Sequence, residues 1–340
     1  MILRALAGRR PRIALLRGTP GLGDLLCAVP SWRALRAAVP DAHVTLVAAP
    51  FATWAPERYP AYVDAHLPFP GYPGLPDQPE DPAATLAFLA EAQARRFDLV
   101  IQQHGSGGVS NPLARMLGGA RTGGFHVPGQ YVPDHALCIA YPASEHEVRR
   151  HLLLLAALGA PPQGEHLEFP VREDDRHALL AAAPELADGA PYVVLHPGAN
   201  DPARRWPAAS FAAAADALAA EGLRVVLTGV AAERALLAEV GAAMSAPALD
   251  LGERTPLGSL AALLAGSRLL VANDTGTTHL ACAVGTPSVA VLLAPSSATW
   301  APLDADRHPG LWADDDGVVS VERVLAEARR LLDGALAPAR

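Results

Sequence analysis

The sequence predicts an α/β protein made of two doubly wound domains, each built on a parallel sheet. Three observations predict this class. Short apolar runs typical of buried strands alternate with segments of helical spacing. This alternation occupies the first third of the chain and starts again near residue 190. A length of 340 residues also fits two domains of about 150 residues each better than one.

The first domain is expected over residues 1–170. Its strands are expected at Arg12–Arg17, His43–Ala48 and Phe97–Gln103. Leu25–Val39 has the spacing of an amphipathic helix, interrupted only by Pro30. Pro68–Pro82 is rich in proline and lacks a hydrophobic period, so it predicts a surface loop.

The second domain is expected over residues 185–317, with the boundary between Pro161 and Gly189, where Pro, Gly and acidic residues cluster. Four strands are expected here, at Tyr192–His196, Arg224–Thr228, Leu269–Ala272 and Ser288–Leu292. Four helices alternate with them, at Pro207–Glu221, Ala231–Ala243, Leu257–Ala265 and Gly276–Val284. A last helix over residues 318–335 is expected to pack back toward the first domain.

The composition excludes several classes of protein. A net charge of −8 argues against a nucleic-acid binder, although the N-terminal stretch is locally basic. That stretch contains Arg4, Arg9, Arg10, Arg12 and Arg17 and could face an anionic acceptor, a membrane surface or only solvent. Three scattered cysteines and the lack of an apolar run of about 18 residues indicate a reduced, cytoplasmic protein that can at most lie on a membrane.

The glycine-rich loop after the first strand carries the first candidate functional residue, Asp24. The loop contains Gly18, Gly21 and Gly23, but its spacing is not that of a dinucleotide fingerprint and it lacks the Gly-Lys-Ser/Thr of a P-loop. Asp24 could cap the following helix. It could also be a general base, with Gly21 and Gly23 letting an acceptor approach the backbone.

The loops after the strands of the second domain suggest a site for a diphosphate and a nucleoside. A helix that starts at Gly276 and Thr277 offers free N–H groups to an anion, and Arg204 or Arg205 could clamp a diphosphate. Glu233 could accept hydrogen bonds from ribose hydroxyls. The candidate binding residues in these loops are His196, Gly198, Arg204, Arg205, Glu233, Asp274, Thr275, Gly276, Thr277 and His279.

Taken together, these stretches resemble glycosyltransferase family 9, the heptosyltransferase family. The resemblance covers both predicted domains in order. It is carried by RIALLRGTPGLGDLLCAVPSWRALRAAVPDAHVTLV, FDLVIQQHG, YVVLHPGANDPARRWPAASF, RVVLTGVAAE and LLVANDTGTTHLACAVGTPSVAVL.

The resemblance implies a GT-B fold, in which the second of two Rossmann-like domains binds the nucleotide sugar and the first faces the acceptor. It also implies transfer with inversion and without a metal, ADP-heptose as donor, and a glycan, glycolipid or small molecule as acceptor. Asp24 matches the catalytic base of the family, and Glu233 its ribose-binding acid. Arg204 stands where the family usually has a lysine, in a chain whose 27 Lys and Arg residues are all Arg.

Other interpretations remain open at this point. They are a glycosyltransferase with a different nucleotide sugar, a non-catalytic nucleotide-sugar-binding protein, and an NAD-type oxidoreductase. The last is disfavoured because this sequence lacks the Gly-x-Gly-x-x-Gly motif after Arg17 and after His196. No metal site and no cofactor are expected. His146, Glu147 and His151 resemble a zinc helix, but the two histidines are five residues apart and do not share a face. His104 ends a first-domain strand and is a candidate acceptor-side residue.

Overall fold

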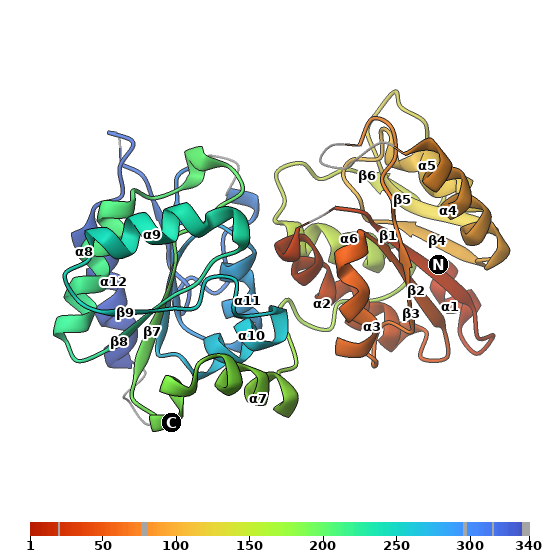
Figure 1. Ribbon diagram of the computed structural model, residues 1–340. Coiled ribbons are helices and arrows are strands. Elements are labelled where there is room, and N and C mark those ends of the chain that lie inside the picture. Colours follow the sequence, from red (N-terminus) through yellow and green to blue (C-terminus); the bar gives the residue numbers. More distant parts are fainter. Residues whose placement is uncertain (20, 76–80, 295–297, 315, 335–340) are drawn as a thin grey trace. The chain divides into compact units, whose positions relative to one another are not determined.

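The computed structural model describes residues 1–19, 21–75, 81–294, 298–314 and 316–334. The chain divides into two compact units, Met1–His166 and Leu167–Arg340. Each unit contains one six-stranded sheet (Figure 1). All strand pairs within both sheets are parallel.

The first unit has the strand order β3-β2-β1-β4-β5-β6. Its strands are β1 Arg12–Arg17, β2 His43–Ala48, β3 Ala65–Pro68, β4 Leu99–Gln102, β5 Arg121–His126 and β6 Cys138–Ala140. Its helices are α1 Ile2–Leu6, α2 Leu22–Ala38, α3 Ala55–Arg58, α4 Pro82–Ala94, α5 Ser110–Met116 and α6 Glu147–Leu158, with a 3-10 turn η1 at Pro50–Trp54. Helix α6 packs against α2, while α4 and α5 share a core cluster with β1 and β4.

The second unit repeats the arrangement, with the order β9-β8-β7-β10-β11-β12. Its strands are β7 Tyr192–His196, β8 Arg224–Leu227, β9 Ala248–Asp250, β10 Leu269–Asn273, β11 Ser288–Leu292 and β12 Gly310–Trp312. Its α-helices are α7 Glu173–Ala182, α8 Ala208–Ala220, α9 Arg234–Ala243, α10 Leu257–Gly266, α11 Gly276–Val284 and α12 Val321–Gly334. Short 3-10 turns η2 Pro184–Asp188, η3 Pro202–Arg204 and η4 Ala231–Glu233 lie between them.

Both sheets have the Rossmann strand order, in which the chain reverses direction across the sheet next to the first strand. The apolar runs predicted as strands form inner strands of the sheets. Four of them, β1, β2, β7 and β11, have the bounds expected from the sequence. The short edge strands β3, β6, β9 and β12 were not predicted, because three or four residues carry too little pattern.

The C-terminal helix belongs to the core of the second unit. Helix α12 packs against α8, β10 and β11. Its apolar face, which includes Val324, Ala328 and Leu331, is part of the core of the second unit.

The predicted loop Pro68–Pro82 extends from the last residue of β3 to the first residue of α4. Residues 76–80 of this loop lie outside the described part of the chain. Asp81 accepts hydrogen bonds from the amides of Ala83 and Ala84 and so caps α4. Within the described residues, no helix is both long and apolar enough to cross a membrane.

Candidate functional site

The candidate residues of each unit lie where the strands on either side of the chain reversal end. In the first unit, Arg17 ends β1 and His104 follows β4. In the second unit, His196 ends β7 and Asn273 ends β10. In open parallel sheets, the loops at this point form the ligand-binding edge. Each unit therefore has its candidate residues at the carboxyl ends of its own strands.

Asp24 lies in the first turn of α2 but does not cap it. The N-cap is Gly21, and Asp24 is the third helical residue, which leaves its side chain available for other contacts. A carboxylate in the first turn is also favoured by the helix dipole. The N-cap interpretation of Asp24 is therefore wrong, because the helix starts three residues earlier than the apolar pattern suggests.

The Asp24 carboxylate is fixed on one side and accessible on another. Its Oδ1 accepts a hydrogen bond from Arg17 Nη2 at 2.9 Å, and its side chain is 23% exposed. The carboxylate also lies directly over Gly21, where a Cβ atom would overlap Oδ2. Gly21 has an ordinary backbone conformation with φ −89°, so glycine is needed here for space and not for flexibility. A partly exposed, oriented carboxylate of this kind can accept a proton.

Arg17 is buried, which corrects its assignment to a basic N-terminal surface. Only 2% of Arg17 is exposed. Its Nη2 also donates to Glu147 Oε1 at 2.7 Å, and its Nη1 donates to the carbonyl oxygen of Gln103 at 2.7 Å. Burial alone would lower the pKa of Arg17, but Glu147 and Asp24 raise it above its usual value. Arg17 is therefore a permanent buried cation beside Asp24.

The His-Glu motif at the start of α6 contributes to the surroundings of Arg17. His146 caps α6 by accepting a hydrogen bond from the amide of Val148. Glu147 pairs with Arg17 and Arg150, and His151 Nε2 lies 3.2 Å from Glu147 Oε1. The two histidines have different roles, and the motif is used for helix capping and for charge pairing.

His104 lies at the same end of the first sheet as Arg17, and it is 7% exposed. Its carbonyl oxygen accepts hydrogen bonds from Ser110 Oγ and Gln102 Nε2. Its ring Nδ1 is buried and has no hydrogen-bond partner among the described residues. Burial, together with the charge of Arg17, lowers the pKa of His104 to about 4, so the ring is neutral at neutral pH.

Asn273, to which the sequence reasoning gave no role, connects the loops of the second unit. It is fully buried. Its Oδ1 accepts from the amide of Trp206 at 2.9 Å, and its Nδ2 donates to the carbonyl of Pro197 at 2.8 Å. The sequence feature that could have indicated a role for Asn273 is its place as a polar residue at the end of an otherwise apolar strand. Its amide fixes the loops after β7 and β10 relative to each other.

The two neighbouring arginines have different environments. Arg204 Nη2 contacts both the Oδ2 and the carbonyl oxygen of Asp274 at 2.6 Å, and Arg204 is one-third exposed. Its Nε is buried without a partner among the described residues. Arg205, through Nε and Nη2, donates twice to the carbonyl oxygen of Ala199. Arg204 thus retains donor capacity for a ligand, whereas the donors of Arg205 that contact Ala199 stabilise the loop.

Helix α11 begins next to Arg204. Its N-cap is Thr275, whose hydroxyl is buried and has no hydrogen-bond partner in the described part of the chain. The first N–H groups of a helix, here those of Gly276 and Thr277, have no partner within the helix. The Thr278 hydroxyl donates to the carbonyl of Asn273, and the His279 ring contacts the Trp300 ring edge to face. This helix start has the donors that an anion requires.

Glu233 lies in η4 after β8 and is 7% exposed. Its Oε2 accepts from the amide of Val230 at 2.9 Å and lies 4.0 Å from His196 Nε2. His196 Nδ1 contacts Thr228 Oγ1 at 3.1 Å, and burial lowers the pKa of this ring. A Cβ atom at Gly198 would overlap the Glu233 carboxylate. Gly198 therefore provides space for a carboxylate, as Gly21 does in the first unit.

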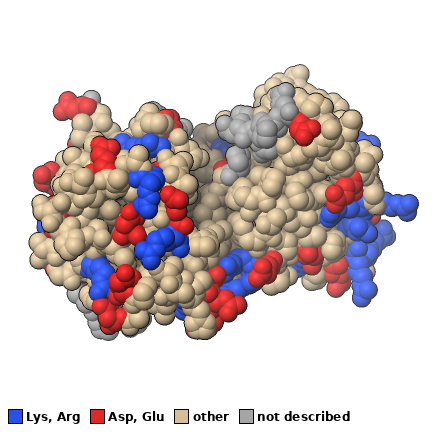
Figure 2. Space-filling model, in the orientation of Figure 1, with Lys and Arg blue, Asp and Glu red and all other residues tan. Residues whose placement is uncertain are grey.

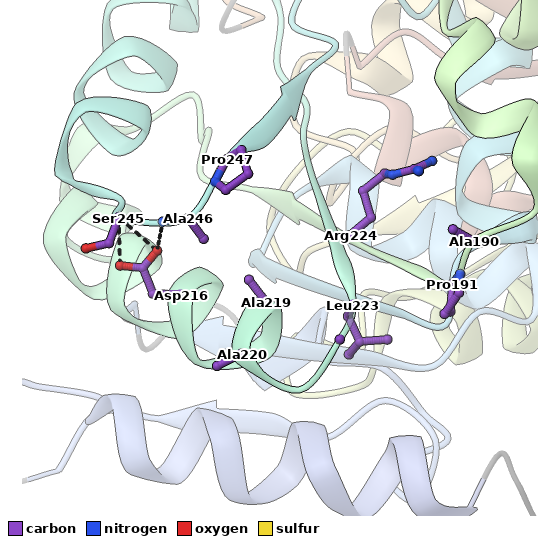
Figure 3. Close-up of a pocket in the computed structure, with 11 residues that line it drawn as sticks. Ala190, Pro191, Asp216, Ala219, Ala220, Leu223, Arg224, Ser245, Ala246 and Pro247 are labelled. Atoms are coloured by element: carbon purple, nitrogen blue, oxygen red, sulfur yellow. Dashed lines mark hydrogen bonds between the residues drawn. The ribbon is translucent and has the colours of Figure 1, made fainter.

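A separate pocket of the second unit lies at the amino-terminal ends of its strands (Figure 3). It includes Pro191, Arg224 and Pro247, which precede or begin β7, β8 and β9. In Figure 3 the Asp216 carboxylate accepts hydrogen bonds from the amides of Ser245 and Ala246. Because ligands of such sheets bind at the carboxyl ends of the strands, this pocket is not the candidate site.

Comparison with known proteins gives a family and a fold. The model of glycosyltransferase family 9 (heptosyltransferase) matches residues 86–317, which is more than half of the chain. Lipopolysaccharide heptosyltransferase 2 of Salmonella typhimurium is 35% identical over 140 residues, which are 40% of this chain and 40% of that protein. The aligned region thus spans less than half of that relative's length.

Solved structures match over nearly the whole chain. The glycosyl transferase family 9 protein of Veillonella parvula has a TM-score of 0.81 at 21% identity, covering 95% of this chain and 97% of its own. The ADP-heptose lps heptosyltransferase II of E. coli has a TM-score of 0.77 at 22% identity, covering 96% and 100%. These likenesses confirm the expected GT-B fold of two Rossmann-like domains.

Proposed function

The chain belongs to glycosyltransferase family 9, a family of glycosyltransferase enzymes, and from this membership we propose that it transfers heptose from ADP-heptose to a hydroxyl group of a lipopolysaccharide glycan. The observation that carries the proposal is the placement of Asp24. Its carboxylate is ionically paired to Arg17, partly exposed, and positioned at the binding edge of the first sheet.

In the proposed reaction Asp24 is the general base. The acceptor hydroxyl gives its proton to the carboxylate while its oxygen bonds to the anomeric carbon from the face opposite the diphosphate. The bond between that carbon and the diphosphate oxygen breaks, its electron pair stays on the oxygen, and ADP leaves. The transition state resembles an oxocarbenium ion, and the anomeric configuration is inverted.

The second unit is proposed to bind the donor. The diphosphate would accept hydrogen bonds from Arg204, from the Thr275 hydroxyl and from the first N–H groups of α11. Two buried donors without partners, Arg204 Nε and Thr275 Oγ1, support this assignment. An arginine and a helix start can stabilise the charge that develops on the leaving diphosphate, so we propose that no metal ion is required.

Glu233 is proposed to accept hydrogen bonds from the ribose. Its Oε2 already bonds to the amide of Val230, which fixes the orientation of the carboxylate. His196 and Gly198 contribute by position, the first next to the carboxylate and the second by leaving space for it. His279 and Asp274 are proposed to support the helix start, since Asp274 pairs with Arg204.

The acceptor is proposed to be a glycolipid, so the enzyme would work in the cytoplasm at the inner face of a membrane. Arg4, Arg9 and Arg10 are exposed, and Figure 2 shows basic side chains gathered at one end of the first unit. Exposed arginines attract anionic lipid surfaces. Flotation with vesicles of anionic and of neutral lipid tests this contact, and equal recovery with both would contradict it.

The first test is calorimetric titration with ADP, UDP, GDP and NAD in the presence of EDTA. We expect ADP to bind preferentially. Preference for UDP or GDP would indicate another nucleotide sugar, and tight binding of NAD would indicate an oxidoreductase. An absolute need for a divalent metal would contradict metal-independent binding.

The second test is transfer from ADP-heptose to lipopolysaccharide acceptors that lack heptose. Asp24→Asn preserves size and removes the base, so we expect the transfer rate to fall about 100-fold or more, with ADP affinity unchanged. Transfer by Asp24→Asn at the normal rate would eliminate Asp24 as the base. ADP binding without any transfer by the unmodified protein would favour a non-catalytic nucleotide-sugar-binding protein.

A further inference from the structure

A buried group of three charged side chains and one histidine contacts Asp24 through Arg17 and has no direct part in the proposed chemistry. It consists of Arg17 from β1 and of Glu147, Arg150 and His151 from α6, and none of the four is more than 5% exposed. We refer to these four residues as the buried charge cluster. Burying charges is costly unless they are paired, so such an arrangement calls for an explanation.

Arg17 joins Asp24 to Glu147. A single nitrogen, Nη2, lies 2.9 Å from Asp24 Oδ1 and 2.7 Å from Glu147 Oε1. The other terminal nitrogen, Nη1, donates to the backbone of Gln103, which fixes the plane of the guanidinium. Because that plane is rigid, the position of Glu147 determines where Arg17 can offer a hydrogen bond to Asp24.

Glu147 is itself fixed from several sides. Its Oε2 pairs with Arg150 Nη1, and His151 lies against its Oε1. Arg150 is anchored by the carbonyl oxygens of Ala143 and Glu145. Burial alone would raise the pKa of Glu147, but the charges of Arg17 and Arg150 lower it well below its usual range. Glu147 is therefore an anion throughout the working pH range.

The charges around Asp24 balance. Burial and Arg17 lower the pKa of His151, so its ring is neutral. Two arginines then face two carboxylates, Glu147 and Asp24. Other titratable groups that interact with Arg17 are Cys27 from α2, His104 from the segment after β4 and Tyr141 from the segment before α6. From α6 they are Glu147 and His151, with Arg150 next to Glu147.

We propose that Glu147 is a positioning residue which, acting through Arg17, sets both the place of the Asp24 carboxylate and the ease with which it accepts a proton. The proposal rests on the proposed function in so far as Asp24 is the base. Without Glu147, the whole charge of Arg17 would fall on Asp24 and make it a weaker base. With Glu147, Arg17 orients Asp24 while its charge is shared between two carboxylates.

The test measures the protonation of Asp24 directly. In protein with ¹³C-labelled aspartate and glutamate carboxyl groups, the Asp24 signal is identified by its loss in Asp24→Asn. In Glu147→Gln we expect the pH midpoint of this signal to fall by about 1 pH unit, because a neighbouring negative charge is removed. In Arg17→Gln we expect it to rise, because Glu147 then faces Asp24 without the cation.

The opposite signs separate an electrostatic role from a structural one, since general loosening would move both variants in the same direction. The matched control is Glu165→Gln. Glu165, which follows α6, pairs with Arg149 of α6 at 3.0 Å, but the two side chains are 44% and 49% exposed, so no shift is expected. Thermal unfolding establishes that each variant is folded.

An Asp24 midpoint that does not move in Glu147→Gln, or that moves in the same direction in both variants, would overturn the proposal. If Glu147→Gln does not fold, Arg17→Gln decides alone, and a midpoint that fails to rise there has the same consequence. The titration needs no sugar donor. Shifted midpoints in a protein that transfers no sugar would therefore contradict the proposed function and support the role of Glu147.

In an active enzyme, the acidic limb of the pH profile of kcat/KM should follow the same midpoints. It should move to lower pH in Glu147→Gln, with a lower rate on the plateau and an unchanged KM for the donor. A rise in donor KM with kcat unchanged would instead assign Glu147 to donor binding and overturn the positioning role.

Discussion

The Asp24 carboxylate occupies the space that a side chain at Gly21 would need. The atom that would be displaced is the end of a side chain, so Gly21→Ala should move Asp24 and leave the fold intact. We expect kcat to fall about 10-fold to 100-fold, in line with the loss of a positioned general base, while ADP affinity changes little. Steady-state kinetics and calorimetry measure the two quantities.

The control for this substitution is Gly241→Ala in α9, where a Cβ atom would meet nothing within 4 Å. Alanine there should leave turnover unchanged and stabilise the helix by about 0.5–1 kcal/mol. Full activity of Gly21→Ala would mean that the observed position of Asp24 is not the one used in the reaction.

Unlike Gly21→Ala, Gly198→Ala should mainly weaken the binding of ADP. A Cβ atom at this position would overlap the Glu233 carboxylate, which is proposed to bind the ribose. We expect ADP affinity to fall about 10-fold, equivalent to the loss of one or two hydrogen bonds. Glu233→Gln should weaken ADP binding by a similar factor, and the double variant should add little to either change. Strictly additive losses would argue that Gly198 acts independently of Glu233.

Arg204 and Arg205 should respond differently to substitution. Arg204→Gln is expected to weaken ADP binding about 10-fold to 100-fold, because a charged hydrogen-bond donor to the diphosphate is lost. Arg204→Lys keeps the charge and should retain most of the affinity. Arg205→Gln should mainly lower the melting temperature, since Arg205 bonds to the Ala199 carbonyl. A larger loss of ADP affinity in Arg205→Gln than in Arg204→Gln would reverse this assignment.

Two buried histidines should make stability depend on pH. Burial is the largest cause of the lowered pKa values of His104 and His308, both about 4 instead of 6.5. As the pH falls, the two rings are protonated in the unfolded chain before they are protonated in the folded protein. The stability that the neutral rings give the folded protein is therefore full above pH 6.5 and is lost as the pH falls toward 4. Each histidine should contribute up to about 3 kcal/mol to the free energy of unfolding.

Urea unfolding between pH 4 and 7 tests this dependence. His308→Gln should flatten the loss of stability at low pH, although its contact with Ser288 Oγ at 2.9 Å would change as well. His177→Gln, at a side chain that is 70% exposed, should leave the profile unchanged. A profile that does not change in His308→Gln would mean that this ring has the same pKa in the folded protein as in the unfolded chain.

Much of the fold could be predicted from local pattern. Buried parallel strands are continuous apolar runs, and Tyr192–His196 has the bounds expected from the sequence. The pattern did not show that α2 begins at Leu22, because glycines at its start have no hydrophobic period. Because the helix begins three residues before Leu25, Asp24 lies in its first turn and contacts Arg17 instead of capping the helix.

The sequence by itself determined two Rossmann-like domains, the resemblance to a glycosyltransferase family, and the loops that contain the candidate residues. These depend on periodicities and motifs within short segments. Only the tertiary structure decided which charges meet. Arg17 and Glu147 are 130 residues apart, and their contact exists because α6 packs against α2. A strong charge pair over such a distance leaves no periodic trace in the sequence, so an arginine at a strand end and a glutamate at a helix start could not be connected in advance.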